Sequence, residues 1–339
     1  MAVRATHCSS PSRRPSPLSG SRRTPDVPDL VARAEAGEAR AVARLISLVE
    51  DASPALREVM ALLAPRAGHA RVVGLTGSPG VGKSTSTSAL VAAYRRRGMR
   101  VGVLAIDPSS PVSGGALLGD RIRMQEHATD DGVFIRSMAS RGHLGGLSWA
   151  TPQALRVLAA AGCDVVLIET VGVGQAEVEV ASLADTTLVL LAPGMGDGIQ
   201  AAKAGILEVA DIFVVNKADR DGADTVVRDL RYMLSLGDRR ADGGWTVPIV
   251  KTIAAKGEGA DEVVEAIERH GDWLAATGEL QAARRRRAAD EVEAIALTTL
   301  RDRIGDLRGN EALDLLATRV VAGEIDPYAA ADELVDALT

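Results

Sequence analysis

The glycine-rich segment at residues 77–85 carries the strongest chemical signal in the sequence. Its residues are Gly77-Ser78-Pro79-Gly80-Val81-Gly82-Lys83-Ser84-Thr85. This spacing, between a short apolar run and a helix-length stretch, is the pattern of a phosphate-binding loop. The glycines let successive backbone N–H groups turn toward a phosphate, and the following helix adds its positive dipole end. We therefore expect Lys83 to bridge the β- and γ-phosphates of a nucleotide in catalysis, and Ser84 to ligate Mg²⁺.

A second motif, Asn216-Lys217-Ala218-Asp219, directly follows the apolar run 212–215 and indicates which base is bound. A carboxylate at its last position accepts hydrogen bonds from guanine N1–H and N2–H₂, whereas adenine would leave it unpaired. Lys217 is expected to lie along the base plane. The loop 252–256, with Ala254 and Ala255 at its centre, is expected to present a backbone N–H to guanine O6. The predicted ligand is therefore GTP or GDP.

Two acids, Asp107 and Glu169, stand at the ends of apolar runs. The carboxyl ends of parallel strands meet at one edge of a sheet, so both acids are predicted beside the γ-phosphate, as Mg²⁺ ligands and in catalysis. An alternative stays open, in which either acid only caps the helix that follows it. Glu169-Thr-Val-Gly172 occupies the place of the usual Asp-x-x-Gly, and we expect the Gly172 N–H to sense the γ-phosphate. The polar segment 107–124 resembles a switch loop whose Asp120 would complete the Mg²⁺ shell on closure.

The elements that must position these residues are visible as short apolar runs. The runs predicted as strands are 72–76, 101–106, 165–169, 187–192, 212–216 and 247–250. They are continuous rather than alternating, which is typical of strands covered on both faces, and helix-length stretches separate most of them. The fold class predicted is therefore α/β, a phosphate-loop NTPase with a doubly wound, mostly parallel sheet.

Helical spacing flanks this sheet region on both sides. Residues 30–65 predict two or so helices with a break at Gly37, and the chain after Trp273 predicts helices over 279–303, 310–322 and 327–338. The expected domains are a disordered Arg/Ser/Pro-rich tail (1–28), an N-terminal helical extension (29–68), a GTPase domain (69–276) and a C-terminal helical arm (277–339).

Composition excludes several classes of partner. The net charge of −6 includes five arginines before the first acid, Asp26, so the remainder carries −11 and is a poor binder of nucleic-acid backbones. Aromatic residues make up only 2%, too few for a base-stacking platform. Cys8 and Cys163 lie too far apart to suggest a disulfide framework, which favours a cytoplasmic location. No apolar run is long enough to span a membrane.

Four stretches together resemble one known family. They are DPSSPVSGGALLGDRIRM (107–124), ETVGVGQAEVEV (169–180), PGMGDGIQAAKAGILEVAD (193–211) and NKAD (216–219). They are similar to the MeaB/ArgK family, GTPases that act as chaperones of adenosylcobalamin-dependent methylmalonyl-CoA mutase. The resemblance runs from about residue 30 to residue 338, and it implies a homodimer joined largely by C-terminal helices, with a role in guarding cofactor loading of the mutase.

The same resemblance assigns site residues one by one. It implies residues 77–85 for the phosphates, and Ser84, Asp107, Asp120 and Glu169 for Mg²⁺. It further implies Asn216, Lys217 and Asp219 for guanine. Asp197, Gln200 and Lys203 match a mobile switch loop that in this family relays the nucleotide state to the mutase.

Two questions stay open at this level. Family members have also been described as kinases linked to arginine transport, so a phosphate-loop kinase or ATPase linked to arginine/ornithine transport remains the alternative function. Val173, not a glutamine, follows Gly172, so we expect slow intrinsic hydrolysis that the mutase accelerates. The sequence does not specify which acyl-CoA mutase is the partner, nor whether the protein also expels damaged cofactor.

Overall fold

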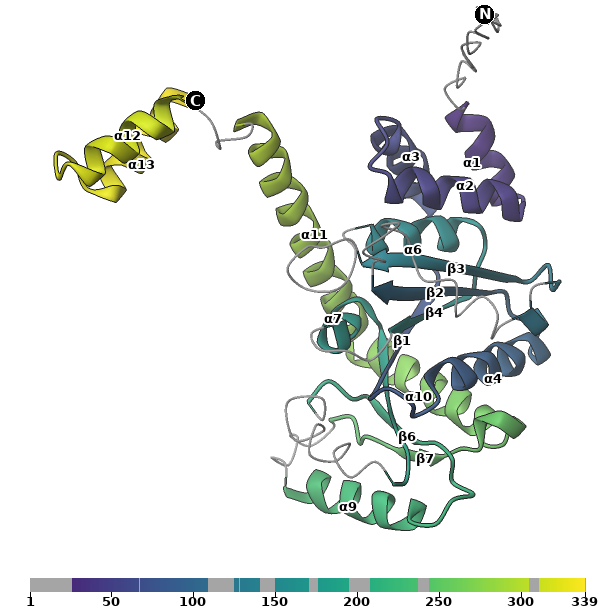
Figure 1. Ribbon diagram of the computed structural model, residues 1–339. Coiled ribbons are helices and arrows are strands. Elements are labelled where there is room, and N and C mark those ends of the chain that lie inside the picture. Colours follow the sequence, from purple (N-terminus) through teal and green to yellow (C-terminus); the bar gives the residue numbers. More distant parts are fainter. Residues whose placement is uncertain are drawn as a thin grey trace, which may run out of the picture.

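The computed structural model describes residues 26–66, 68–108, 125–127, 129–140, 150–170, 176–194, 208–236, 244–304 and 311–338. Nearly all of the predicted N-terminal tail (1–28) lies outside these ranges. The centre of the molecule is a seven-stranded sheet in which every strand pair is parallel (Figure 1). The strands are β1 (Arg71–Thr76), β2 (Val101–Pro108), β3 (Val133–Ser140), β4 (Val165–Thr170), β5 (Thr186–Leu191), β6 (Ile212–Val215) and β7 (Ile249–Lys251). This architecture confirms the predicted fold class.

The strand order is β3-β2-β4-β1-β5-β6-β7, so β1 lies between β4 and β5. The chain runs from β1 toward one edge of the sheet to form β2, and from β5 toward the other edge to form β6 and β7. The carboxyl end of β1 is therefore next to the point where the winding reverses, which is where α/β sheets bind their ligands.

All six predicted strands are present, and β3 is a further strand that was not predicted. This strand lies at the edge of the sheet and pairs only with β2 among the described strands. Its sequence, VFIRSMAS, carries Arg136 and Ser137 in the middle rather than a continuous apolar run. Arg136 is tolerated there because its guanidinium forms an ion pair with Glu50 of an N-terminal helix.

Two layers of helices cover the sheet. The helices α4 (Lys83–Arg96) and α10 (Ala260–Thr277) pack on the face to which Leu75 and Leu190 point. The opposite face is covered by α6 (Thr151–Ala160), α7 (Ala176–Leu183) and α9 (Ala223–Leu236). Because side chains alternate between faces along a strand, Val189 points to α9 while its neighbour Leu190 points to the other layer.

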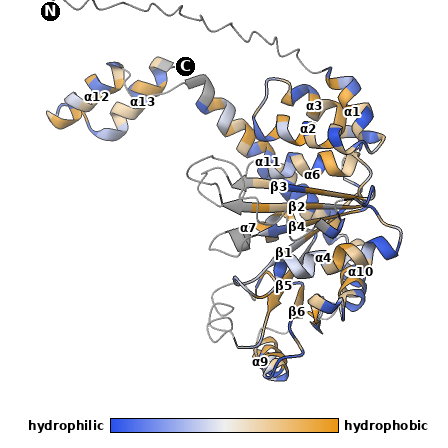
Figure 2. Ribbon diagram, turned by 45° about the vertical axis from the view of Figure 1, so that its right-hand side comes forward, coloured by the Kyte–Doolittle hydropathy of each residue, from blue (hydrophilic) through white to orange (hydrophobic). Residues whose placement is uncertain are grey.

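Three N-terminal helices, where two or so were predicted, pack over α6 and the β3 edge (Figure 2). They are α1 (Val27–Glu35), α2 (Ala39–Glu50) and α3 (Leu56–Leu63), followed by the short helix η1 (Ala64–Arg66). Gly37 follows the end of α1 with φ +84°, as its predicted role as a break requires. Fully buried side chains on α2, among them Leu45 and Val49, join these helices to the main core.

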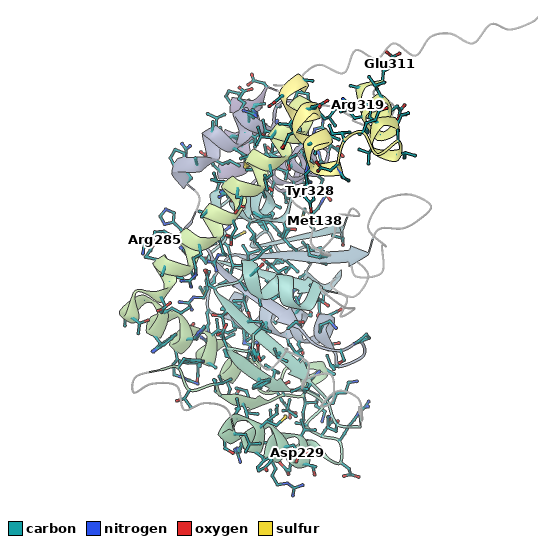
Figure 3. The ribbon with its side chains drawn as sticks, turned by 90° about the vertical axis from the view of Figure 1, so that its left-hand side faces the viewer. Met138, Asp229, Arg285, Glu311, Arg319 and Tyr328 are labelled. Atoms are coloured by element: carbon teal, nitrogen blue, oxygen red, sulfur yellow. The ribbon has the colours of Figure 1, made fainter. Side chains whose placement is uncertain are left out.

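The C-terminal region consists of α11 (Glu279–Ile304), α12 (Glu311–Val321) and α13 (Pro327–Leu338), close to the predicted ranges. The helix α11 begins against the sheet domain and extends away from it, and α12 and α13 pack on each other beyond its end (Figures 1 and 3). No helix in the described ranges has the length and apolarity needed to cross a membrane.

Candidate nucleotide-binding site

The phosphate loop connects β1 to α4 at the reversal point of the sheet. Gly77, Gly80 and Gly82 have φ values of +140°, +81° and +99°, which side-chain-bearing residues rarely adopt. Space is also restricted, because a Cβ atom on Gly77 would lie 2.4 Å from the Leu190 carbonyl oxygen, and one on Gly82 would lie 2.4 Å from the amide nitrogen of Asn216. Two of the glycines that define the motif are therefore required by backbone conformation and by close packing.

Lys83 is the first residue of α4, and it is buried at 7% exposure. Its Nζ donates to the carbonyl oxygens of Gly77 at 2.6 Å and Ser78 at 3.2 Å. The ammonium group thus lies across the mouth of the loop, close to where the backbone N–H groups would hold a phosphate. This position suits the contact predicted for Lys83.

Glu169 is the penultimate residue of β4, which is buried along its whole length. Its backbone is in register with Leu75 of β1, and the residue is 4% exposed. The hydroxyl of Ser84 donates to Glu169 Oε1 at 2.5 Å. The hydroxyl of Thr87 lies 2.9 Å from Oε2. The two carboxylate oxygens are therefore both oriented by hydroxyl groups of α4.

Asn216 links the phosphate loop to the predicted guanine loops. Its Nδ2 donates to the Val81 carbonyl oxygen at 2.8 Å. Its Oδ1 accepts from the backbone N–H of Ala254 at 3.0 Å and from the Thr252 hydroxyl at 3.2 Å. One buried amide, 3% exposed, therefore fixes the two loops relative to each other.

Lys217 also connects the predicted guanine-binding motif to the phosphate loop. It adopts φ +56°, an uncommon conformation for a residue with a side chain, and its Nζ donates to the Gly80 carbonyl oxygen at 2.6 Å. Asp219, two residues later, is exposed. Its carboxylate is therefore available to a base at the surface. The preceding Ala218 N–H donates to the carbonyl oxygen of Thr252, just before the short helix η4 (Ala254–Lys256).

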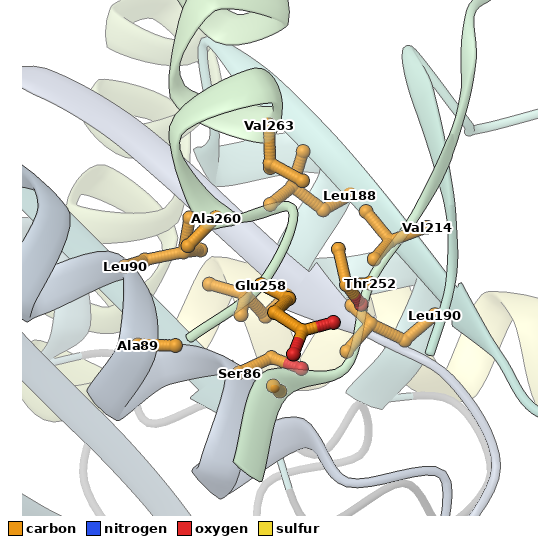
Figure 4. A pocket seen from close by; sticks show the side chains of 12 residues that line it. Ser86, Ala89, Leu90, Leu188, Leu190, Val214, Thr252, Glu258, Ala260 and Val263 are labelled. Atoms are coloured by element: carbon orange, nitrogen blue, oxygen red, sulfur yellow. The ribbon is translucent and has the colours of Figure 1, made fainter. Parts of the chain in front are cut away.

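A small, mostly apolar pocket lies behind η4, between α4, α10 and the sheet (Figure 4). Ser86 of α4 and Glu258, which follows η4, point into it. The Ser86 Oγ atom is buried and has no hydrogen-bond partner among the residues that the structure describes. The pocket therefore lies next to the predicted base-binding loop and separate from the predicted phosphate contacts.

Comparison with known proteins shows the family of the chain. Residues 42–307 match the family model described as methylmalonyl-CoA mutase-associated GTPase MeaB. The chain is 46% identical over 310 residues to a putative GTPase of Pyrococcus abyssi, covering 91% of this chain and 96% of that one. The chain belongs to the MeaB family.

Two further proteins similar to this chain carry different names. The chain is 38% identical to the GTPase ArgK of Escherichia coli, covering 84% of this chain and 87% of that one. The crystal structure of an LAO/AO transport system kinase superposes with a TM-score of 0.68 at 28% identity, covering 91% of this chain and 96% of that one. The predicted family is confirmed, and as a member of the MeaB family the chain is a GTPase.

Several predicted site residues of this MeaB-family chain lie outside the described ranges. They are Gly172, Asp120, Asp197, Gln200 and Lys203. Asp107 is described for its backbone only, at the end of β2, two residues past Ala105, which is in register with Glu169. The strand ends thus bring the Asp107 and Glu169 backbones to the same edge, as predicted.

Two polar residues on α4 were not predicted to take part in the site. Thr87 contacts Glu169, and its position three residues after Ser84 on a helix was the signal that could have revealed it. Ser88 lies 2.9 Å from Nε2 of His127, and its hydroxyl also donates to Glu126. His127, in the short helix η2 (Gln125–His127), is therefore packed against α4.

Proposed function

We propose that this MeaB-family GTPase hydrolyses GTP in a Mg²⁺-dependent reaction and acts as a chaperone that protects and gates cofactor loading of an adenosylcobalamin-dependent methylmalonyl-CoA mutase. The observation that carries the nucleotide part is the Asn216 amide, which joins the phosphate loop to the loop that would face guanine. The mutase part is supported by the family description, which names an association with that enzyme.

The described residues fit a Mg²⁺ ion. Mg²⁺ prefers a few oxygen ligands completed by water and nucleotide phosphates, so a dedicated cluster of acids is not required. The described ranges contain no group of three or more His, Cys, Asp or Glu side chains placed to hold a metal. Ser84 donates its proton to Glu169, which leaves hydroxyl lone pairs for a cation. Ser84, Asp107, Asp120 and Glu169 would hold the ion, which would offset phosphate charge during hydrolysis.

In the proposed mechanism the chain binds GTP through residues 77–85, with Lys83 moving from the loop carbonyls to the β- and γ-phosphates. Asn216, Lys217 and Asp219 would select guanine, together with the backbone at Ala254 and Ala255. Val173, and not a glutamine that could orient a water, directly follows Gly172, so hydrolysis by the isolated protein would be slow. The mutase would supply the missing acceleration.

The partner would read the nucleotide state through ordered loops. GTP would order the segment carrying Asp120, the segment around Gly172 and the loop with Asp197, Gln200 and Lys203, and hydrolysis would release them. These loops leave the sheet at the ends of β2, β4 and β5, at the same edge as the phosphate loop. Their shared location supports a common surface for the mutase.

We also propose a homodimer formed by the C-terminal arm (277–339), beside an N-terminal extension (29–68) and a GTPase domain (69–276), in the cytoplasm. The support is the exposure of large apolar side chains along α11, α12 and α13, since such a surface favours association. These residues are Val292, Ile295, Leu297, Leu300, Leu315, Val321, Tyr328 and Val335.

A second candidate is a phosphate-loop kinase or ATPase linked to arginine/ornithine transport. The structural similarity to a protein described as an LAO/AO transport system kinase favours it. A guanine-selecting motif and the absence of a recognisable acceptor-substrate motif in the sequence disfavour it.

The deciding experiment is nucleotide turnover by the purified protein, with GTP and ATP, in the presence and absence of a methylmalonyl-CoA mutase from the same genome. We expect slow GTP hydrolysis, no ATP hydrolysis, and acceleration by the mutase. The Lys83→Ala variant controls for contaminating phosphatases. GTP turnover that the mutase leaves unchanged would refute the gating role, and turnover of ATP in preference to GTP would favour the transport-linked alternative.

A further inference from the structure

Thr87 lies one turn beyond Ser84 on α4 and is fully buried. Its hydroxyl oxygen is 2.9 Å from Glu169 Oε2, while the Ser84 hydroxyl is 2.5 Å from Oε1. Residues three apart on a helix face the same side, so these two hydroxyls reach the two oxygens of one carboxylate. The phosphate-loop motif ends before Thr87 and assigns it no role.

We propose that Thr87 is a positioning residue for Mg²⁺ binding, because it fixes the Glu169 carboxylate in the orientation that lets Ser84 donate to Oε1 and offer its lone pairs to the metal. This inference rests on the proposed Mg²⁺-dependent GTPase function. It goes beyond that function by giving the metal site a residue that need not touch either metal or nucleotide.

The direction of the Thr87 hydrogen bond follows from acceptor strength. The hydroxyl oxygen also lies 3.0 Å from the carbonyl oxygen of Lys83, and it has one proton to donate. A bond to an ionised carboxylate is charge-assisted and stronger than one to a carbonyl. The proton is therefore directed to Glu169, while the Lys83 carbonyl is a secondary acceptor.

The need for such a residue follows from the length of the acid. Glu169 stands where the usual motif has aspartate, and its extra methylene adds one rotatable bond between backbone and carboxylate. The backbone is fixed, since β4 pairs with both β1 and β2 around Glu169. The side-chain torsions are then the remaining freedom, and the Thr87 hydroxyl restricts them.

The test compares binding of a fluorescent GDP analogue to full-length protein with Mg²⁺ in excess and with Mg²⁺ removed by chelator. Thr87→Val keeps the shape of the side chain and removes the hydroxyl. We expect it to raise the Mg²⁺ concentration needed for half-maximal effect by about 10-fold or more, as loss of a residue that orients metal ligands generally does. Affinity for the analogue without Mg²⁺ should stay at the wild-type value.

Two matched variants separate this role from a general packing effect. Thr87→Ser keeps the hydroxyl and should restore the wild-type Mg²⁺ requirement. Ser86→Ala removes a buried hydroxyl of the same helix that has no hydrogen-bond partner in the described part of the chain, and it should leave the requirement unchanged. Thermal unfolding of each variant verifies that the fold is retained, and Thr87→Ala replaces Thr87→Val if the valine does not fit.

The reciprocal variant Glu169→Asp provides a measurement that does not depend on folding of Thr87→Val alone. Aspartate is too short to reach Thr87 from the same backbone position, so Thr87→Val combined with it should add no further loss. Independent, additive losses would overturn the proposal. So would a wild-type Mg²⁺ requirement in Thr87→Val. Wild-type protein that binds the analogue without any response to Mg²⁺ would instead refute the proposed Mg²⁺-dependent function.

Discussion

One edge of the sheet is formed by the carboxyl ends of its strands, and the opposite edge by their amino ends. Each of these two edges holds a buried carboxylate, but different kinds of group donate hydrogen bonds to it. At the carboxyl ends of the strands, the hydroxyls of Ser84 and Thr87 orient the Glu169 oxygens without bringing positive charge. At the amino ends of the strands, Asp185 accepts hydrogen bonds from the guanidinium groups of Arg284 and Arg287. Its side chain is only 4% exposed. The first arrangement suits a carboxylate that helps hold a cation, and the second neutralises a carboxylate permanently.

The Asp185 cluster shows what the basic run 284–287 does. Arg284 and Arg287 lie one turn apart on α11 and both contact Asp185, whose Oδ2 also accepts from the Val72 N–H at 3.1 Å. Arg285, between them, is exposed and projects from the helix surface (Figure 3). Half of the run thus anchors the start of α11 to the segments that lead into β1 and β5.

The same edge is closed by a second set of side chains. His270 of α10 is buried against Thr186 at the start of β5, with 2.9 Å between His270 Nδ1 and Thr186 Oγ1. Trp245 donates its indole N–H to the Asp211 carbonyl oxygen at 2.8 Å, and its ring lies next to His270. Stabilising contacts therefore gather at the amino ends of the strands, which we call the structural edge. The residues predicted to bind the nucleotide gather at the carboxyl ends, which we call the functional edge.

Lys83→Ala should impair GTP hydrolysis at the functional edge without destabilising the structural edge, and it should have the largest effect. Removing the ammonium that would contact the phosphates is expected to lower GTP hydrolysis by about 100-fold or more, since preorganised donors to developing charge contribute on that scale. Phosphate release measures the loss. Arg96→Ala on the same helix removes an exposed ion pair with Asp261 and should hydrolyse GTP normally. Full activity of Lys83→Ala would show that this loop is not the active one.

Asp185→Asn should destabilise the structural edge and leave nucleotide binding at the functional edge unchanged. The amide keeps the shape but leaves two guanidinium groups without their anion, so we expect the free energy of unfolding in urea to fall by about 2–4 kcal/mol. Asp290→Asn makes the same chemical change at an exposed position on α11 and should be neutral. Affinity for GDP should be unchanged in both. A large loss of GDP affinity in Asp185→Asn would contradict the separation of the two edges.

Asp219→Asn should alter the choice of base at the functional edge and leave the stability of the fold unchanged. The amide would donate where guanine also donates, so GTP affinity should drop by about 10- to 100-fold and preference should shift toward xanthosine triphosphate. Competition binding with both nucleotides measures this. Asp221→Asn, an exposed neighbour, is the matched control. Unchanged GTP affinity would remove Asp219 from base recognition.

Arg287→Lys should have the smallest effect. Lysine keeps the positive charge but lacks the planar fork that reaches both Asp185 and the Ala184 carbonyl oxygen. We expect a loss of about 0.5–1.5 kcal/mol in unfolding free energy, the value of a typical hydrogen bond. Arg285→Lys, in the same run, should be indistinguishable from wild type. Equal effects of the two substitutions would mean that the fork geometry is unimportant.

The features that could be predicted from the sequence are those that are local along the chain. The glycine spacing at 77–82 predicted the phosphate loop because positive φ angles are encoded residue by residue. The buried strands were predicted because a strand covered on both faces is apolar throughout. Helical periodicity placed α11 and α13 within a residue of their observed bounds. The edge strand β3 was not predicted, because polar residues interrupt its apolar run. Such residues are tolerated there, since β3 pairs with only one neighbour among the described strands.

The contacts between side chains that are distant in the sequence could be seen only in the folded chain. Thr87 reaches Glu169 across 82 positions in the sequence, and Arg284 reaches Asp185 across 99. Asn216 appeared in the sequence as part of a base-selecting motif, whereas the fold also makes it the connection to Val81 of the phosphate loop. Such contacts leave no periodic pattern, because they depend on strand order and helix placement. The chemistry of the site was therefore encoded locally, and its support was set by packing.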